Sequence, residues 1–153
     1  MSSEAEMSPR DEFSFLANEV RACSRCDLRN DCIAPVPGRG LISAPLFLIG
    51  QSPGEREDRE GKAFIGPAGV ILREALSKAG IEDYYVTNSV KCHPIANKKA
   101  KVHQRAACRH WLETELLLWQ PPSGRPKLIV ALGDEAYISL FGRGFEKNNL
   151  FAA

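Results

Sequence analysis

The chain has 153 residues, of which 44% are hydrophobic and 25% are charged, and its formal net charge is +1. This balance is typical of a globular domain with its own hydrophobic core, and it excludes a disordered or fibrous chain. A net charge this close to zero also excludes a globally basic nucleic-acid-binding chain, so any basic surface has to be local.

The N-terminal residues are polar and acidic, which predicts a disordered tail over residues 1–7 and a single domain over residues 8–153. No apolar run follows a basic start, as it would in a secretory signal, and no apolar stretch is long enough to cross a membrane. The sequence therefore predicts a cytoplasmic protein with no membrane partner.

In chain order, the first predicted element is a helix that begins after Ser8 and runs to about Arg21, because Ser8, Pro9 and Asp11 form a typical helix start. The Pro- and Gly-rich residues 34–40 predict a loop. A buried strand over residues 44–50 and a polar turn over residues 51–58 follow.

Strands and helices then alternate to the end of the chain. We expect a helix over 66–80 ending at Gly80, a strand over 83–90, a helix over 102–120, a strand over 127–133 and a helix from 134. This order predicts an α/β fold with three layers, α/β/α, around a central parallel sheet. Ligands of such sheets bind beyond the carboxyl ends of the strands, where residues 51–58 and 88–97 are rich in polar groups.

Five cysteines stand out in a chain predicted to be cytoplasmic, where clustered cysteines hold metal more often than disulfides. Cys23 and Cys26 form a C-x2-C pair, whereas Cys92 and Cys108 are separated by 15 intervening residues. Structural zinc usually takes two tight pairs, while an iron–sulfur cluster tolerates wider spacing. Scattered buried thiols are the remaining alternative. Cys32 is predicted to be a free thiol.

Four motifs follow one another in the chain: "GQSPGEREDREGKAFIGPAG", "VTNSVKCHP", "ACRHWLETEL" and "LIVALG". Together they resemble the iron–sulfur uracil-DNA glycosylases, the type-4 branch of the uracil-DNA glycosylase superfamily, from about residue 20 to residue 141. The resemblance implies a DNA-repair enzyme that flips uracil out of DNA and hydrolyses its N-glycosidic bond. It also implies a [4Fe–4S] cluster held by Cys23, Cys26, Cys92 and Cys108, with zinc as the alternative.

The resemblance implies that Phe64 stacks on the extruded base and that Asn88 reads its edge. An Asn amide accepts a hydrogen bond from uracil N3–H and donates one to O4, whereas cytosine presents the opposite arrangement. Without the motifs, Phe64 reads as a core residue and Asn88 as a turn former.

For bond cleavage, the resemblance implies that the turn at Gln51 and Ser52 faces the substrate and that Glu57 stabilises the sugar cation or orients water. The family usually has Glu where Gln51 stands, and an amide cannot act as a general base. We therefore expect Gln51 to position water or the base. Asp58 reads equally well as a turn or cap residue.

The segment "NKKAKVHQRAACR" is basic and contains no acidic residue. Its cations predict a salt-sensitive, sequence-independent contact with DNA phosphates, although most such runs are simply solvated. The resemblance adds His93 to this DNA contact. The candidate DNA-binding residues are therefore His93, Lys98, Lys99, Lys101 and Arg105.

The family continues past the "LIVALG" strand with a His-Pro-Ser turn that stabilises the uracil anion. The three histidines of this chain, His93, His103 and His110, all lie upstream. We therefore expect a domain truncated at its C-terminus, and three functions stay open. One is the glycosylase itself, and another is a catalytically weak or inactive relative that binds uracil or DNA. The third is a zinc-stabilised structural domain with no nucleic-acid role.

Overall fold

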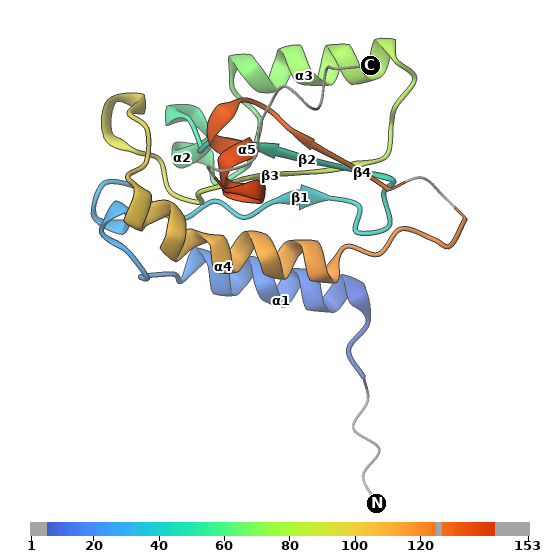
Figure 1. The fold of residues 1–153 in the computed structure, drawn as a ribbon, viewed down its shortest axis with the longest axis horizontal. Helices are drawn as coiled ribbons and strands as arrows, with labels where there is room; N and C mark the ends of the chain where they lie inside the picture. Colours follow the sequence, from blue (N-terminus) through green and yellow to red (C-terminus); the bar gives the residue numbers. More distant parts are fainter. Residues whose placement is uncertain (1–5, 125–126, 143–153) are drawn as a thin grey trace, which may run out of the picture.

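The computed structural model describes residues 6–124 and 127–142, which form a sheet between two layers of helices (Figure 1). Its strands are β1 (Arg39–Gly40), β2 (Leu46–Gly50), β3 (Tyr84–Asn88) and β4 (Leu128–Ala131), in the order β1-β3-β2-β4. β2 pairs in parallel with β3 and with β4, whereas β1 pairs antiparallel with β3. The predicted α/β/α fold is confirmed, with one antiparallel edge strand added to the parallel sheet.

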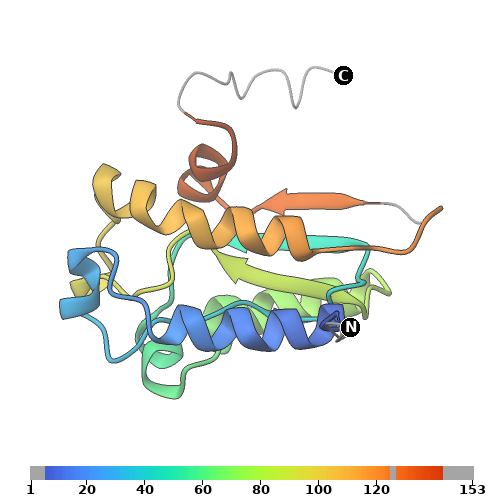
Figure 2. The ribbon, with the colours of Figure 1, turned by 90° about the horizontal axis from the view of Figure 1, so that it is seen from below.

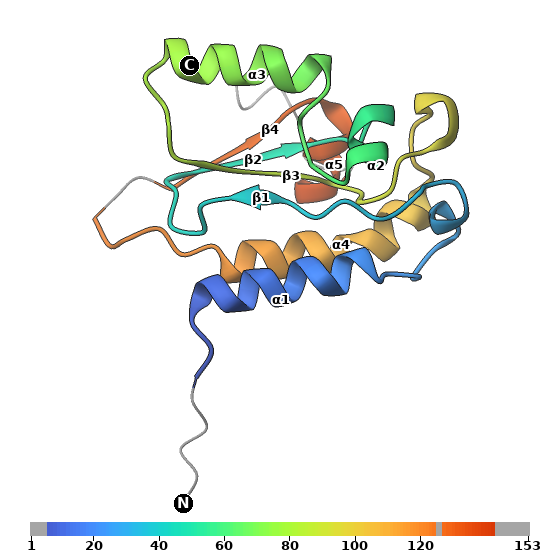
Figure 3. The ribbon, with the colours of Figure 1, turned by 180° about the vertical axis from the view of Figure 1, so that it is seen from behind.

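The α-helices are α1 (Pro9–Arg21), α2 (Glu55–Glu60), α3 (Pro67–Lys78), α4 (Val102–Leu118) and α5 (Asp134–Phe141). Two short 3-10 helices, η1 (Asp27–Asn30) and η2 (Ile95–Asn97), lie in the loops. α1 and α4 lie side by side on one face of the sheet (Figure 2), and α3 covers the other face (Figure 3). None of the helices described is long and apolar enough to cross a membrane.

The central strand β2 is buried on both faces because its side chains alternate between the two helical layers. Leu46 and Leu48 pack with Leu76 of α3. Phe47 and Ile49 pack in a second cluster on the opposite face, which includes Leu112, Trp119 and Ala136. This double packing fixes β2, and therefore the turn that follows it.

Two predicted helix boundaries are confirmed, the start of α1 and the end of α3. The Asp11 backbone N–H donates to Ser8 Oγ at 3.2 Å, so Ser8 caps α1. Gly80 follows α3 with φ +71°, a conformation that glycine adopts without steric cost.

Two loop predictions were wrong in detail. The expected polar turn over 51–58 contains the start of α2, which begins after Gly54 and carries an i,i+4 ion pair between Arg59 and Glu55. The expected loop over 34–40 ends in β1, which is only two residues long and so gives no alternating pattern. Of the predicted tail over residues 1–7, only residues 6 and 7 are described, and they form neither helix nor strand. Residues 143–153 lie outside the described residues, and the truncation stays a prediction.

Candidate functional site

A pocket of about 510 Å³ opens at the carboxyl ends of β2 and β3. All five side chains predicted for catalysis or substrate binding line it: Gln51, Ser52, Glu57, Phe64 and Asn88. Its remaining walls are largely apolar and come from α3 and from Leu132 after β4. The strand ends therefore bring together residues that are up to 37 positions apart, as the rule for parallel sheets predicts.

Phe64 and Asn88 meet above Gly50, the last residue of β2. Gly50 pairs with Asn88 in the parallel ladder. A Cβ built on Gly50 would overlap the Phe64 ring and lie 2.6 Å from Asn88 Oδ1. The glycine is therefore required by this close approach of ring and amide. The two groups predicted to stack on a base and to read its edge face one cavity.

The turn after β2 is tied to the segment after β3 by three hydrogen bonds. The Gln51 carbonyl oxygen accepts from Ser89 Oγ at 2.7 Å and from the Val90 backbone N–H at 3.2 Å. His93 Nδ1 lies 2.8 Å from the Pro53 carbonyl oxygen. These bonds hold the turn against the pocket, and they give His93 a structural contact besides its predicted contact with DNA.

The two buried carboxylates of α2, Glu57 and Asp58, have different surroundings. Glu57 lines the pocket, is only 9% exposed, and accepts a hydrogen bond from the Gly66 backbone N–H at 2.9 Å. Asp58 accepts from the Ile33 backbone N–H at 2.9 Å and so anchors the loop before β1. Asp58 therefore has the structural role that the sequence allowed, while Glu57 remains in the pocket.

The predicted basic surface divides into exposed and buried cations. Lys98, Lys99 and Lys101 are exposed on the loop before α4. Of these, Lys99 lies 3.8 Å from Glu135 and forms an ion pair with it. The Arg105 guanidinium is largely buried and paired with Glu135 at 2.6 Å, and it also donates to the Ala100 carbonyl oxygen at 2.7 Å. Arg105 thus stabilises the loop before α4 through buried contacts. Its charge alone does not indicate this role.

Cys23, Cys26, Cys92 and Cys108 line one small cavity, although they come from three separate parts of the chain. All five cysteines of the chain are free of disulfides. Over residues 6–124 and 127–142, no group of three or more His, Cys, Asp or Glu side chains is arranged to hold a metal ion. The four cysteines are nevertheless gathered around one cavity.

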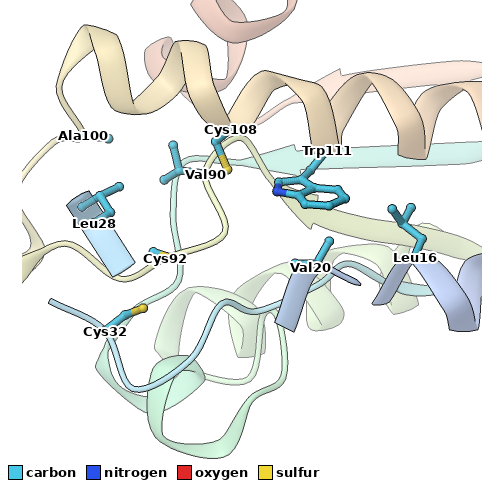
Figure 4. Packing of buried hydrophobic residues seen from close by; sticks show 9 residues of the cluster. All are labelled: Leu16, Val20, Leu28, Cys32, Val90, Cys92, Ala100, Cys108 and Trp111. Atoms are coloured by element: carbon cyan, nitrogen blue, oxygen red, sulfur yellow. The ribbon is translucent and has the colours of Figure 1, made fainter. Parts of the chain in front are cut away.

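Several backbone and indole N–H groups point at these sulfurs. Trp111 Nε1 donates to Cys23 Sγ and the Lys91 backbone N–H donates to Cys108 Sγ, each at 3.2 Å. Figure 4 shows Cys92, Cys108 and Trp111 within one packed cluster with Val90 and Leu28. Hydrogen bonds of this kind stabilise a thiolate and orient it toward a bound cation.

Burial works against the thiolate form of the same residues. It raises the pKa of Cys108 to about 11, although the Lys91 cation opposes the shift. Burial, followed by the contact with Cys32, raises the pKa of Cys92 well above its usual value. These thiols stay protonated at neutral pH unless a bound cation compensates their charge. The donor set, four thiols with N–H groups directed at two of them, has the chemistry of a metal-binding site.

A buried ion pair connects the cysteine cavity to the pocket. Lys91 Nζ pairs with Glu115 Oε1, and both side chains are only 1% exposed. The same Nζ donates to Thr87 Oγ1 at 2.6 Å and to the Asn88 carbonyl oxygen at 2.7 Å. Tyr85 donates its hydroxyl to Glu115 Oε2 at 2.6 Å. Lys91 therefore holds the backbone of Asn88 while its own N–H contacts Cys108.

Sequence reasoning missed Gly50, Lys91 and Glu115 as parts of this arrangement. The sequence identifies Gly50 only as the end of a strand, because no neighbouring residue indicates that the Phe64 ring packs against it. Lys91 and Glu115 are 24 residues apart, in the turn after β3 and on α4. The only signal in the sequence is that Lys91 directly precedes Cys92 in the motif "VTNSVKCHP". This signal does not indicate a buried ion pair, because lysines are rarely buried.

Residues 37–152 match the profile of the Uracil DNA glycosylase superfamily. The chain is similar to the type-4 uracil-DNA glycosylase of Thermotoga maritima, with 36% identity over 90% of this chain and 70% of that protein. It is also similar to the type-4 uracil-DNA glycosylase of Saccharolobus solfataricus, with 37% identity over 86% of this chain and 60% of that protein.

A type-4 uracil-DNA glycosylase of Archaeoglobus fulgidus is 35% identical over 77% of this chain and 58% of that protein. The chain thus spans between 58% and 70% of the length of these three relatives. The matched region contains the whole pocket and two of the four cysteines that line the small cavity. The chain therefore belongs to the uracil-DNA glycosylase superfamily, as a relative of its type-4 members.

Proposed function

We propose that the chain is a cytoplasmic DNA-repair glycosylase that hydrolyses the N-glycosidic bond of uracil in DNA. The observation that carries the proposal is the meeting of Phe64 and Asn88 over Gly50 in one pocket. A base that leaves the duplex loses its stacking, and one aromatic ring restores about 1–3 kcal/mol of it. Phe64 supplies that ring, and the Asn88 amide forms hydrogen bonds with the exposed edge of the base.

Base selection follows from the position of the Asn88 amide, which is 4% exposed. Uracil offers N3–H and O4 to such an amide, whereas cytosine offers an acceptor and a donor in their place. Beside a buried amide, a mismatched pair of polar groups is left unsatisfied, and each one costs about 1–3 kcal/mol. The pocket is therefore suited to uracil.

For bond cleavage we assign Glu57 to the sugar and Gln51 to water. Glu57 keeps one oxygen on the Gly66 N–H, which orients the carboxylate toward the pocket where an oxocarbenium-like charge develops. Gln51 sits on the anchored turn beside Ser52, where its amide can orient a water molecule but cannot take its proton. Ser52 contributes to substrate binding from the same turn.

For DNA binding we propose that Lys98, Lys99 and Lys101 neutralise phosphates, with His93 at the rim of the pocket. Arg105 serves this surface through its ion pair with Glu135, which fixes the loop. Three phosphate contacts give a log–log salt slope of about −2.7 on duplex DNA.

For the cysteine cavity we propose a [4Fe–4S] cluster held by Cys23, Cys26, Cys92 and Cys108, with zinc as the alternative. When bound, the cluster supplies a rigid cross-link between chain segments rather than reaction chemistry. Two of its ligands flank the basic loop, so its effect on DNA binding is to keep that loop in one shape. Trp111 and the Lys91 N–H hold the sulfurs in place.

We expect Cys108→Ser to abolish the iron–sulfur absorbance of the protein purified without oxygen, and to lower its iron and sulfide content below stoichiometry. Cys32→Ser is the matched control, because Cys32 is buried in the same cluster of side chains but does not line the small cavity. Stoichiometric zinc in the wild-type protein, or an equal loss of iron in both variants, would contradict the cluster assignment.

Gln51 favours a second candidate, a relative that binds uracil in DNA and turns it over weakly or not at all. A single-turnover assay separates the two. With protein in excess and the cluster intact, we expect a uracil-containing oligonucleotide to become alkali-labile at the uracil. Absence of cleavage would end the enzyme assignment. Binding that falls on Phe64→Ala, without cleavage, would select the second candidate.

A further inference from the structure

We infer that Arg39 and Arg73 are positioning residues that hold Phe64 over the pocket. The inference rests on the role proposed for Phe64, and it adds two residues to which neither the motifs nor the relatives assign a role. It starts from the backbone of Phe64, which has φ +57°. A bulky residue rarely adopts this left-handed conformation, because its Cβ crowds the following carbonyl group.

Two side chains from distant elements converge on the peptide that follows Phe64. Arg73 Nη1 of α3 donates to the Phe64 carbonyl oxygen at 2.6 Å. Arg39 of β1 donates through Nη2 to the same oxygen at 3.4 Å and through Nε to the Ala63 carbonyl oxygen at 2.6 Å. Charged donors form stronger hydrogen bonds to a carbonyl oxygen than neutral ones do. Together they fix the orientation of two successive peptide groups.

The far side of the same carbonyl group is closed by Gly69. A Cβ on Gly69 would overlap the Phe64 carbonyl oxygen and carbon, so only glycine lets α3 approach this closely. The Phe64 carbonyl thus lies between the backbone of α3 and two guanidinium groups. In this position the Phe64 ring lies against Gly50, which the Asn88 amide also approaches.

Both arginines are exposed, so the competing role for them is direct contact with DNA phosphates. The two roles differ in what they require of Phe64. A phosphate contact acts whether or not the Phe64 ring is present. A positioning residue acts only through that ring, because removing the hydrogen bonds lets φ return to negative values and moves the ring away from Asn88.

A double-mutant cycle with Phe64→Ala tests this difference. We expect Arg73→Ala to lower kcat/KM on a uracil oligonucleotide by at least about 5-fold, and Phe64→Ala to lower it by about 5- to 150-fold, the range of one base–aromatic stack. In the Phe64→Ala background, Arg73→Ala is expected to have no further effect. Arg73→Lys is expected to recover part of the loss, because one ammonium donor still reaches the carbonyl oxygen.

Arg56→Ala is the matched control, since Arg56 is exposed nearby on α2 and pairs only with Glu60 among the described ion pairs. We expect it to leave kcat/KM unchanged. The salt dependence gives a second check. Loss of a phosphate contact reduces the log–log slope by about 0.9, whereas loss of a positioning residue leaves the slope as it was. Additive effects in the cycle, or a reduced slope, would overturn the inference.

A readout without DNA keeps this test separate from the proposed function. A fluorinated phenylalanine placed at position 64 is expected to give one sharp 19F resonance in the wild-type background. In the Arg39→Ala/Arg73→Ala background the resonance is expected to shift and broaden, and in the Arg56→Ala background to stay unchanged. An unchanged resonance in the double variant would overturn the inference even if uracil is cleaved. A changed resonance in a protein that cleaves nothing would overturn only the proposed function.

Discussion

The Lys91→Met variant is expected to lose about 3–5 kcal/mol of unfolding free energy, the largest stability effect that this structure predicts. The reason is the position of Glu115, which is 1% exposed and would keep a buried carboxylate without its cation. Tyr85 would still donate to that carboxylate, since burial and the nearby negative charge raise the pKa of its phenol well above the usual value. Thr87 would also still donate its hydroxyl to this carboxylate, but two neutral donors do not replace an ammonium group. Urea unfolding followed by circular dichroism measures the loss.

Two further variants make this prediction specific. Lys91→Met/Glu115→Leu is expected to recover most of the stability, because removing both charges removes the desolvation penalty with them. Arg59→Ala removes an exposed cation paired with Glu55, and it is expected to change the unfolding free energy by about 0.5 kcal/mol or less. A loss below about 1 kcal/mol for Lys91→Met would show that the buried pair does not have the role given to it here.

The Asn88→Ala variant is expected to have the largest effect on function, a fall of about 30- to 25,000-fold in kcat/KM on uracil. Two hydrogen bonds to the base edge are lost, each worth about 1–3 kcal/mol when its partner stays buried and unpaired. The backbone of residue 88 remains held by Lys91, so the strand end should keep its place. Single-turnover cleavage of uracil-containing single-stranded DNA measures the change.

The matched control for this variant is Asn18→Ala, which removes an exposed amide on α1 whose oxygen accepts from Arg21. It is expected to leave kcat/KM unchanged. Thermal unfolding of both variants checks that they are folded. If Asn88→Ala retained more than about a third of the wild-type kcat/KM while folded, Asn88 would not be the residue that reads the base.

Much of the fold was predictable because its signals are local. Ser8 before Pro9 marks the start of α1, and Gly80 ends α3, since caps depend on neighbouring residues alone. The run of apolar residues in β2 indicates a strand buried on both faces. β1 escaped prediction because two residues form no pattern and its pairing with β3 is entirely tertiary. The short helix α2 escaped because its sequence is as polar as a loop.

The residues that line the site were predictable from the sequence, but the residues that hold them in position were not. The motifs implied Phe64 and Asn88, and the fold brings both into one pocket. Nothing in the sequence indicates that Arg105 turns inward to Glu135, because a cation in a basic run reads the same whether it is paired or free. The same limit hid Arg39 and Arg73, whose partners are backbone carbonyl groups that carry no sequence signal.

The most direct test of the central claim is a crystal structure of the cluster-loaded protein with an oligonucleotide that carries a non-hydrolysable deoxyuridine analogue. We expect the uracil to lie outside the base stack, with its face on the Phe64 ring and its N3–H and O4 on the Asn88 amide. A uracil that stays stacked in the DNA, or that binds away from the ends of β2 and β3, would contradict the account.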